Sequence, residues 1–226
     1  MVDTDYIDKQ LRKYFIIQGP HTIDQITGVV DVDGYVSVGS GITSLPELPV
    51  QFGTVNAFKC SDVGLISLKG SPHTVGTLFW ASGNKLQSLN HGPHTVGTGY
   101  WVHNNQLRSL QGAPRSVPQR MWCSGNQLRD LQGAPQSVGS LWIGKNPLRS
   151  LLGMPKTIST DILLTYDPEL PLLKTLIAPN ILFNTAPRAP PEVSKALNSH
   201  AGRGQAHILA CAIDLIKYGY AANAKQ

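Results

Sequence analysis

A motif that recurs at a nearly constant spacing dominates the middle of this 226-residue chain. Reading from each tryptophan gives the segments WASGNKLQSLNHGP, WVHNNQLRSLQGAP, WCSGNQLRDLQGAP and WIGKNPLRSLLGMP. The leucines and prolines step by 21 residues three times and then by 20, and the asparagines (Asn84, Asn105, Asn126 and Asn146) keep the same phase. A fixed period in this range is typical of stacked units that share one continuous core, so the pattern predicts a solenoid.

The spacing of leucine and asparagine within each unit indicates a leucine-rich repeat. We therefore expect an α/β repeat fold, with one strand per unit forming a parallel β-sheet on the concave face of the solenoid. We divide the chain into a short helical N-terminal cap at 1–33, the solenoid at 34–170 and a C-terminal helical segment at 171–226.

The direction of the tryptophans follows from counting back from the asparagine. In the common pattern L-x-x-L-x-L-x-x-N-x-L, the residues three and five positions before the asparagine face the core, and neighbours in a strand point to opposite sides. The count predicts six buried pairs: Phe58 and Cys60, Phe79 and Ala81, Tyr100 and Val102, Met121 and Cys123, Leu141 and Ile143, Ile162 and Leu164. It points Lys59, Trp80, Trp101, Trp122, Trp142 and Leu163 outward. An alternative count from Val96 or Val117 slips the register by one residue and buries the tryptophans. We favour the asparagine count because Val138 to Asn146 has the standard length.

Two interpretations of the outward tryptophan row remain open. The rings can stack in offset geometry and only stiffen the sheet. They can also form a binding surface, because tryptophan is enriched at interaction hot spots and a contiguous exposed apolar stripe usually marks an interface. The predicted partner-binding residues are Lys59, Trp80, Trp101, Trp122, Trp142, Leu163, His103, Arg108, Arg120, Arg129 and Arg149.

The charge is distributed unevenly along the chain. Residues 1–62 carry four Lys/Arg and eight Asp/Glu, residues 63–156 carry nine and one, and residues 157–226 carry six and five. Arg108, Arg129 and Arg149 share one repeat position. They can form a solvated edge, or bind an acidic partner surface or a nucleic-acid backbone. A nucleic acid is the less favoured partner, because bases need gaps between aromatic platforms and this row is tight.

No arrangement of residues predicts catalysis, a cofactor or a metal site. His73 and His94 share a repeat position, but no third ligand recurs there. The three cysteines do not form a disulfide framework, which favours a reducing compartment. No stretch of about 18 apolar residues predicts a membrane span, and the acidic start MVDTDYIDKQL does not resemble a secretory signal. We expect a non-enzymatic protein.

The two ends predict capping elements, because a terminal coil would otherwise expose its core. Residues 3–15 fit an amphipathic helix opened by Asp3 or Thr4, and 22–38 fit short strands. Residues 191–202 predict a helix that stops at Gly202. A second helix is predicted up to Gly219, with one apolar face formed by Ile208, Cys211, Ala212, Leu215 and Ile216.

The run FGTVNAFKCSDVGLISLKGSPHTVG and the four units after it resemble leucine-rich-repeat proteins of tailed bacteriophages, whose repeats have the form VGGDFxCSxNxLTSLxGAPxxV. Phe58 and Cys60 occupy the F-x-C positions of that pattern. The lead-in ITSLPELPVQFGTV and the tail GRGQAHILACAIDLIKYGYAANAKQ resemble the ends of those proteins. The outward tryptophans and Val63, where the pattern has asparagine, depart from it.

This resemblance implies a viral origin and a binding role without catalytic residues. We expect a virion structural or virion-associated component, part of a larger assembly, that docks on an acidic or apolar protein surface. The alternative is a host-directed factor that binds a host protein, for host takeover or against host defence. The expected location is accordingly the virion or the cytoplasm of an infected bacterium.

Overall fold

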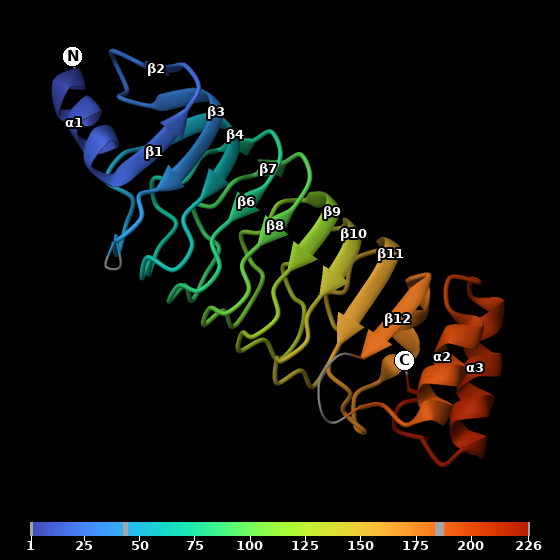
Figure 1. Ribbon diagram of the computed structural model, residues 1–226. Helices are drawn as coiled ribbons and strands as arrows, with labels where there is room; N and C mark the ends of the chain where they lie inside the picture. Colours follow the sequence, from blue (N-terminus) through green and yellow to red (C-terminus); the bar gives the residue numbers. More distant parts are fainter. Residues whose placement is uncertain (1, 43–44, 184–187, 226) are drawn as a thin grey trace.

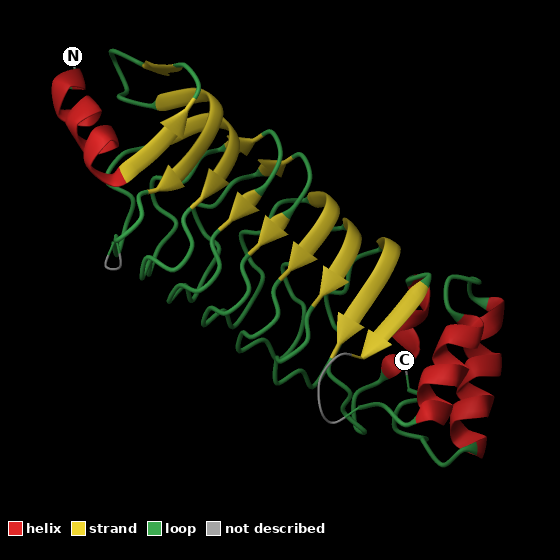
Figure 2. Cartoon of the chain, viewed as in Figure 1, coloured by secondary structure: helices red, strands yellow, loops and turns green. Residues whose placement is uncertain are grey.

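A computed structural model describes residues 2–42, 45–183 and 188–225 and shows a parallel-strand β-solenoid of about seven turns. The strands lie side by side along the long axis, and loops return the chain from each strand to the next (Figures 1 and 2). Residues 43–44 of the predicted solenoid and residues 184–187 and 226 of the predicted C-terminal segment lie outside the described part. The prediction of a repeat solenoid is confirmed.

The sheet follows the order β1-β3-β4-β6-β8-β9-β10-β11-β12. These strands are β1 (Phe15–Gln18), β3 (Val30–Val38), β4 (Phe52–Lys59), β6 (Phe79–Trp80), β8 (Tyr100–Trp101), β9 (Ser116–Trp122), β10 (Ser137–Trp142), β11 (Thr157–Leu164) and β12 (Asn180–Phe183). Three further short strands complete the sheet: β2 (His21–Ile23), β5 (Thr74–Val75) and β7 (Thr95–Val96). Pairing is parallel from β3 to β12, whereas β1 and β2 pair antiparallel with β3.

The predicted register is correct along the whole row. Lys59 pairs with Trp80, each tryptophan pairs with the next, and Trp142 pairs with Leu163. All six residue pairs predicted to face inward are fully or almost fully buried, whereas the four tryptophans remain partly exposed. The alternative register, with tryptophans in the core, is therefore wrong.

The buried side of the strands carries a second aromatic column. Phe79 lies between Phe58 and Tyr100, with centroid distances of 6.0 and 5.2 Å and nearly parallel rings. Met121 and Leu141 continue this column without any exposed surface. Dense packing of this kind makes each coil depend on its neighbours, because no single unit encloses its own apolar side chains.

The repeated asparagines hold successive coils together at the turn after each strand. Asn105 accepts a hydrogen bond at Oδ1 from the Leu86 N–H (3.1 Å) and donates from Nδ2 to the carbonyls of Ala81 (3.0 Å) and Val102 (3.1 Å). Asn84, Asn126 and Asn146 make the equivalent contacts from their own repeats to the preceding coil. These amides satisfy buried backbone groups that the strands cannot pair.

The N-terminal end is closed by helix α1 (Thr4–Tyr14) and strands β1 and β2. Asp3 caps the helix by accepting from the Tyr6 N–H at 2.9 Å, and Leu11 is its buried residue. Phe15, which the sequence pattern assigned to the helix, instead begins β1 and packs edge-on against Phe52 at 5.0 Å. A β-branched run follows it in Ile16 and Ile17, and such residues favour strand over helix.

The C-terminal end contains the 3₁₀ helix η1 (Leu172–Ile177) and helices α2 (Pro191–His200) and α3 (Ala206–Lys217). Asn198 of α2 pairs with the edge strand β12, accepting from the Ile181 N–H at 2.9 Å and donating to its carbonyl at 3.0 Å. Gly202 and Gly219 follow the two helices with positive φ, as predicted. The predicted apolar face of α3 is wrong at Ile216, which is 57% exposed while Cys211 and Leu215 are buried.

Candidate functional site

The outward side of the strands forms a continuous aromatic and basic surface, which we call the Trp face. It consists of Lys59, Trp80, Trp101, Trp122 and Trp142 with His103 and Arg120. A parallel sheet repeats each position at the strand spacing of about 4.8 Å, so one tryptophan per unit becomes one row of rings. The sequence thus places four rings on one side of one sheet.

The rings meet edge to face, which corrects the expected offset stacking. Successive centroids lie 5.1, 5.8 and 5.4 Å apart, with interplanar angles of 69°, 72° and 73°. The positive edge of one indole then contacts the negative face of the next. Each ring is fixed by its neighbours, so the row is a rigid surface.

Three side chains cover ring faces along the row. The Lys59 ammonium lies 4.3 Å from the Trp80 centroid and the Arg120 guanidinium carbon lies 3.7 Å from the Trp142 centroid, both in cation–π geometry. The His103 ring stacks on Trp122 at 3.7 Å and 16°. Burial lowers the pKa of His103, although the nearby Asp62 carboxylate opposes this, so His103 stacks as a neutral ring at neutral pH.

The indole N–H groups differ in their partners. Trp80 donates to the Ser82 hydroxyl, and Trp142 donates to Asp161 Oδ1 at 2.9 Å. Trp101 Nε1 is shielded from solvent and has no partner among the described residues. The same holds for three further polar atoms of this region, His103 Nδ1, Arg120 Nε and Ser124 Oγ.

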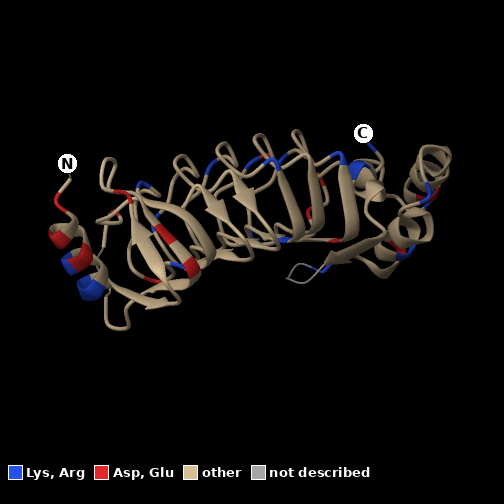
Figure 3. Ribbon diagram, turned by 90° about the horizontal axis from the view of Figure 1, so that it is seen from above, with Lys and Arg blue, Asp and Glu red and all other residues tan. Residues whose placement is uncertain are grey.

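The remaining predicted site residues lie elsewhere or are covered. Leu163 continues the row beside Trp142, as the predicted register requires, but it is only 9% exposed and offers a partner little surface. Arg108, Arg129 and Arg149 are exposed on the loop segments after the asparagine turns, outside the strands. Basic residues follow these loops along the length of the solenoid (Figure 3). The structure therefore separates the predicted residues into the Trp face and a basic loop edge.

The three cysteines are free and buried. Burial raises the pKa of Cys60, raises that of Cys123 to about 12, and raises that of Cys211 to about 11. A thiol is nucleophilic only as the thiolate, so these groups act as apolar packing residues at neutral pH.

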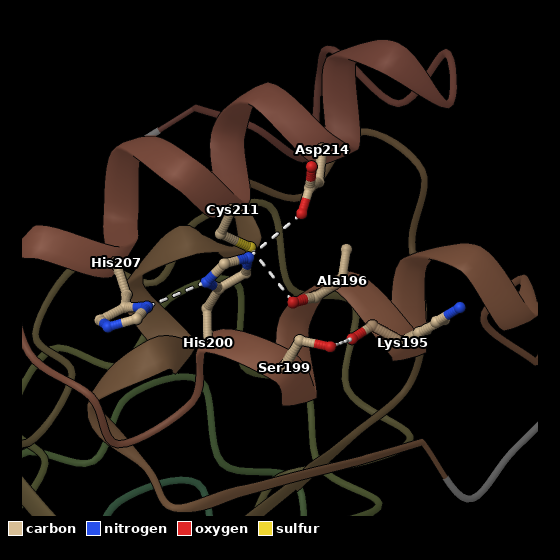
Figure 4. A network of polar contacts seen from close by, with 7 residues as sticks. All are labelled: Lys195, Ala196, Ser199, His200, His207, Cys211 and Asp214. Carbon is tan, nitrogen blue, oxygen red and sulfur yellow. Dashed lines mark hydrogen bonds and ion pairs between the residues drawn. The ribbon is translucent and has the colours of Figure 1, made fainter.

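A second polar cluster, which the sequence pattern did not single out, joins α2 and α3 (Figure 4). Nδ1 of His200 lies 3.1 Å from Nδ1 of His207, and its Nε2 lies 3.1 Å from Asp214 Oδ2. Cys211 donates its S–H to the Ala196 carbonyl at 3.7 Å. Both nitrogens of His200 are occupied, so the cluster connects the two helices and leaves His200 no free nitrogen for a ligand.

No metal-binding arrangement occurs within the described ranges, which contain no group of three or more His, Cys, Asp or Glu side chains able to hold an ion. His73 and His94, which share a repeat position, stack on each other at 4.2 Å. No described helix is long and apolar enough to cross a membrane.

Comparison with family models, with curated proteins and with solved structures gives no match.

Proposed function

We propose that this protein is a non-catalytic protein-binding module of the leucine-rich-repeat type, with the Trp face as its recognition surface on the concave side. The observation that carries this proposal is the row of four partly exposed indoles locked edge to face. A core tryptophan lowers the free energy by leaving water, whereas these rings keep part of their surface in water. Rigid aromatic side chains give a partner a large contact area at little cost in conformational entropy.

The charge around the row favours an acidic or mixed apolar and acidic protein surface. Lys59 and Arg120 lie on the ring faces, and residues 63–156 carry nine basic residues and one acidic residue. Such a field attracts negatively charged partners and raises association rates. A nucleic acid is less favoured, because rings in mutual contact leave no space for bases to insert between them.

The resemblance to bacteriophage leucine-rich-repeat proteins supports a viral origin. We propose a virion structural or virion-associated role, with the protein in the virion. A host-directed factor in the cytoplasm of the infected bacterium is the alternative. Mass spectrometry of purified particles separates the two: stoichiometric amounts in particles support the virion role, and presence only in the cell lysate supports the alternative.

The C-terminal end is a second candidate docking region, because helix α3 exposes apolar side chains. Leu209, Ile213 and Ile216 are 70%, 44% and 57% exposed and recur at i, i+4 and i+7 on one side of the helix. An exposed stripe of this kind on a folded helix is typical of helix-mediated contacts.

The experiment that tests the proposed surface is affinity capture from infected cells with the wild type and the Trp101→Ala/Trp122→Ala variant. The matched control is Ile66→Ala/Leu152→Ala, which removes two exposed apolar side chains from loop segments outside the strands. We expect the tryptophan variant to lose the partner and the control to retain it, with both variants folded by circular dichroism. Equal recovery with the tryptophan variant would refute a binding role for the Trp face.

A further inference from the structure

One groove beside the Trp face has unpaired hydrogen-bond donors in its wall. The position two residues before each tryptophan lies on the same side of the chain as the tryptophan. In three neighbouring units it is occupied by Leu78 and Gly99, directly before β6 and β8, and by Arg120 of β9. Gly99 has no side chain, so a gap opens between its neighbours. The resulting groove has a volume of about 370 Å³, and Trp101, Arg120, Thr98 and Thr160 contribute to its lining.

The indole N–H of Trp101 faces this gap. A Cβ atom placed on Gly99 would lie 3.1 Å from Trp101 Nε1 and 2.9 Å from Leu78 Cδ1. Trp80 and Trp142 both donate to oxygen atoms of the chain, whereas Trp101 Nε1 is shielded and unpaired. A buried donor without an acceptor is costly, so an oxygen atom supplied from outside stabilises this site.

Arg120 supplies a second unpaired donor and a positive charge. Its guanidinium carbon lies 3.7 Å from the Trp142 ring centroid, its Nε is shielded without a partner, and no described carboxylate lies within 4.0 Å of it. The nearby Asp161 is already an acceptor for Trp142 and Ser140. A guanidinium held on an aromatic ring in this way has its remaining donors oriented for a planar anion.

We propose that this groove binds a carboxylate side chain from an acidic segment of the partner protein, with Arg120 and the Trp101 N–H as its donors. The inference rests on the proposed protein-binding function and names the chemistry of the partner at one point of the Trp face. Leu78 covers the gap with the flexible end of its side chain, so the carboxylate enters by displacing a methyl group. The excess of basic residues in 63–156 attracts an acidic segment to the solenoid, and Arg120 places one of these charges at the groove.

The test uses the full chain with ¹⁵N-labelled tryptophan, which gives one indole N–H signal for each of the four rings. The probes are acetylated hexaglutamate and the uncharged, nearly isosteric hexaglutamine. We expect hexaglutamate to shift the Trp101 signal most and hexaglutamine to leave it unchanged. Arg120→Gln should weaken hexaglutamate binding by roughly tenfold, because it removes charge-assisted hydrogen bonds. Arg203→Gln, on the exposed segment between α2 and α3, should change it less than about twofold.

Gly99→Ser is a second variant that fills the groove and gives the Trp101 N–H an acceptor hydroxyl. We expect it to fold and to lose the response to hexaglutamate. Equal shifts with hexaglutamine, or unchanged binding by Arg120→Gln, would overturn the proposal. A response to a ten-nucleotide oligothymidylate in place of hexaglutamate would also overturn it, since the ligand would then be a nucleic acid. If the Trp101→Ala/Trp122→Ala variant loses its partner but hexaglutamate does not bind, the protein-binding function stands and only the carboxylate groove is refuted.

Discussion

Replacing Asn105 with leucine tests the contacts that hold the coils together. Leucine shares the branched Cγ of asparagine, although it is larger, and its side chain neither donates nor accepts a hydrogen bond. The Leu86 N–H, which donates to Asn105 Oδ1 at 3.1 Å, is left without an acceptor in the core. Gln87→Leu is the matched control, because it makes the same type of change at an exposed position in the preceding unit.

The magnitude follows from which partners each backbone group retains. The Ala81 carbonyl keeps a bond from Asn84 at 3.1 Å, and the Val102 carbonyl keeps one from Asn126 at 3.1 Å. Only the Leu86 N–H becomes fully unpaired, at about 1–3 kcal/mol, and the two shared bonds add roughly 0.5 kcal/mol each. We expect Asn105→Leu to lower the free energy of unfolding by about 2–4 kcal/mol.

Thermal unfolding followed by circular dichroism measures this change. In a domain of this size about 1 kcal/mol corresponds to roughly 2–4 °C, so the midpoint should fall by roughly 4–16 °C. Gln87→Leu should stay within about 0.5 kcal/mol of the wild type. An unchanged midpoint for Asn105→Leu would show that the asparagine contacts do not stabilise the stacked coils.

Further predictions concern the thiols and the C-terminal edge. Cys60, Cys123 and Cys211 should not react with a thiol reagent at pH 8 in the folded chain but should react in denaturant, and a fast native reaction would contradict their burial. Burial raises the pKa of Cys123 from 9.0 to about 12, so between these pH values only the unfolded chain loses this proton. The free energy of unfolding should therefore fall as pH rises above 9, by at most about 1.4 kcal/mol per pH unit from this thiol. Cys123→Ala should reduce that slope, and an equal slope would count against the assignment. Asn198→Ala removes both side-chain hydrogen bonds to Ile181 of the edge strand β12. It should lower the free energy of unfolding by about 1–3 kcal/mol and increase aggregation measured by light scattering. Wild-type stability and light scattering would show that Asn198 does not protect the edge strand.

The register of the solenoid could be predicted because a strand has a period of two and the asparagine has one structural role. Once Asn126 is placed in the turn, Met121 and Cys123 must face inward and Trp122 outward, and the structure agrees. The same reasoning gives the register of every repeat, because a one-residue slip would exchange the inward and outward side chains of each strand.

Side-chain detail could not be predicted in the same way. The edge-to-face arrangement of the rings depends on rotamers, and the strand spacing leaves these open. Leu163 is buried although it points outward, because its exposed area depends on which side chains pack around it in three dimensions. The groove at Gly99 joins residues of several coils, so it becomes visible only when Arg120 and Trp101 are placed in three dimensions.

Hydroxyl-radical footprinting of the indoles, with and without the captured partner, tests the central claim most directly. Trp101 and Trp122 keep part of their surface in water in the free chain, so both should be oxidised measurably there. In the complex, their oxidation should fall to the level of buried residues, while oxidation of the exposed Leu152 on the loop side should stay the same. Equal oxidation of both indoles in the free and bound chain would contradict the assignment of the Trp face as the recognition surface.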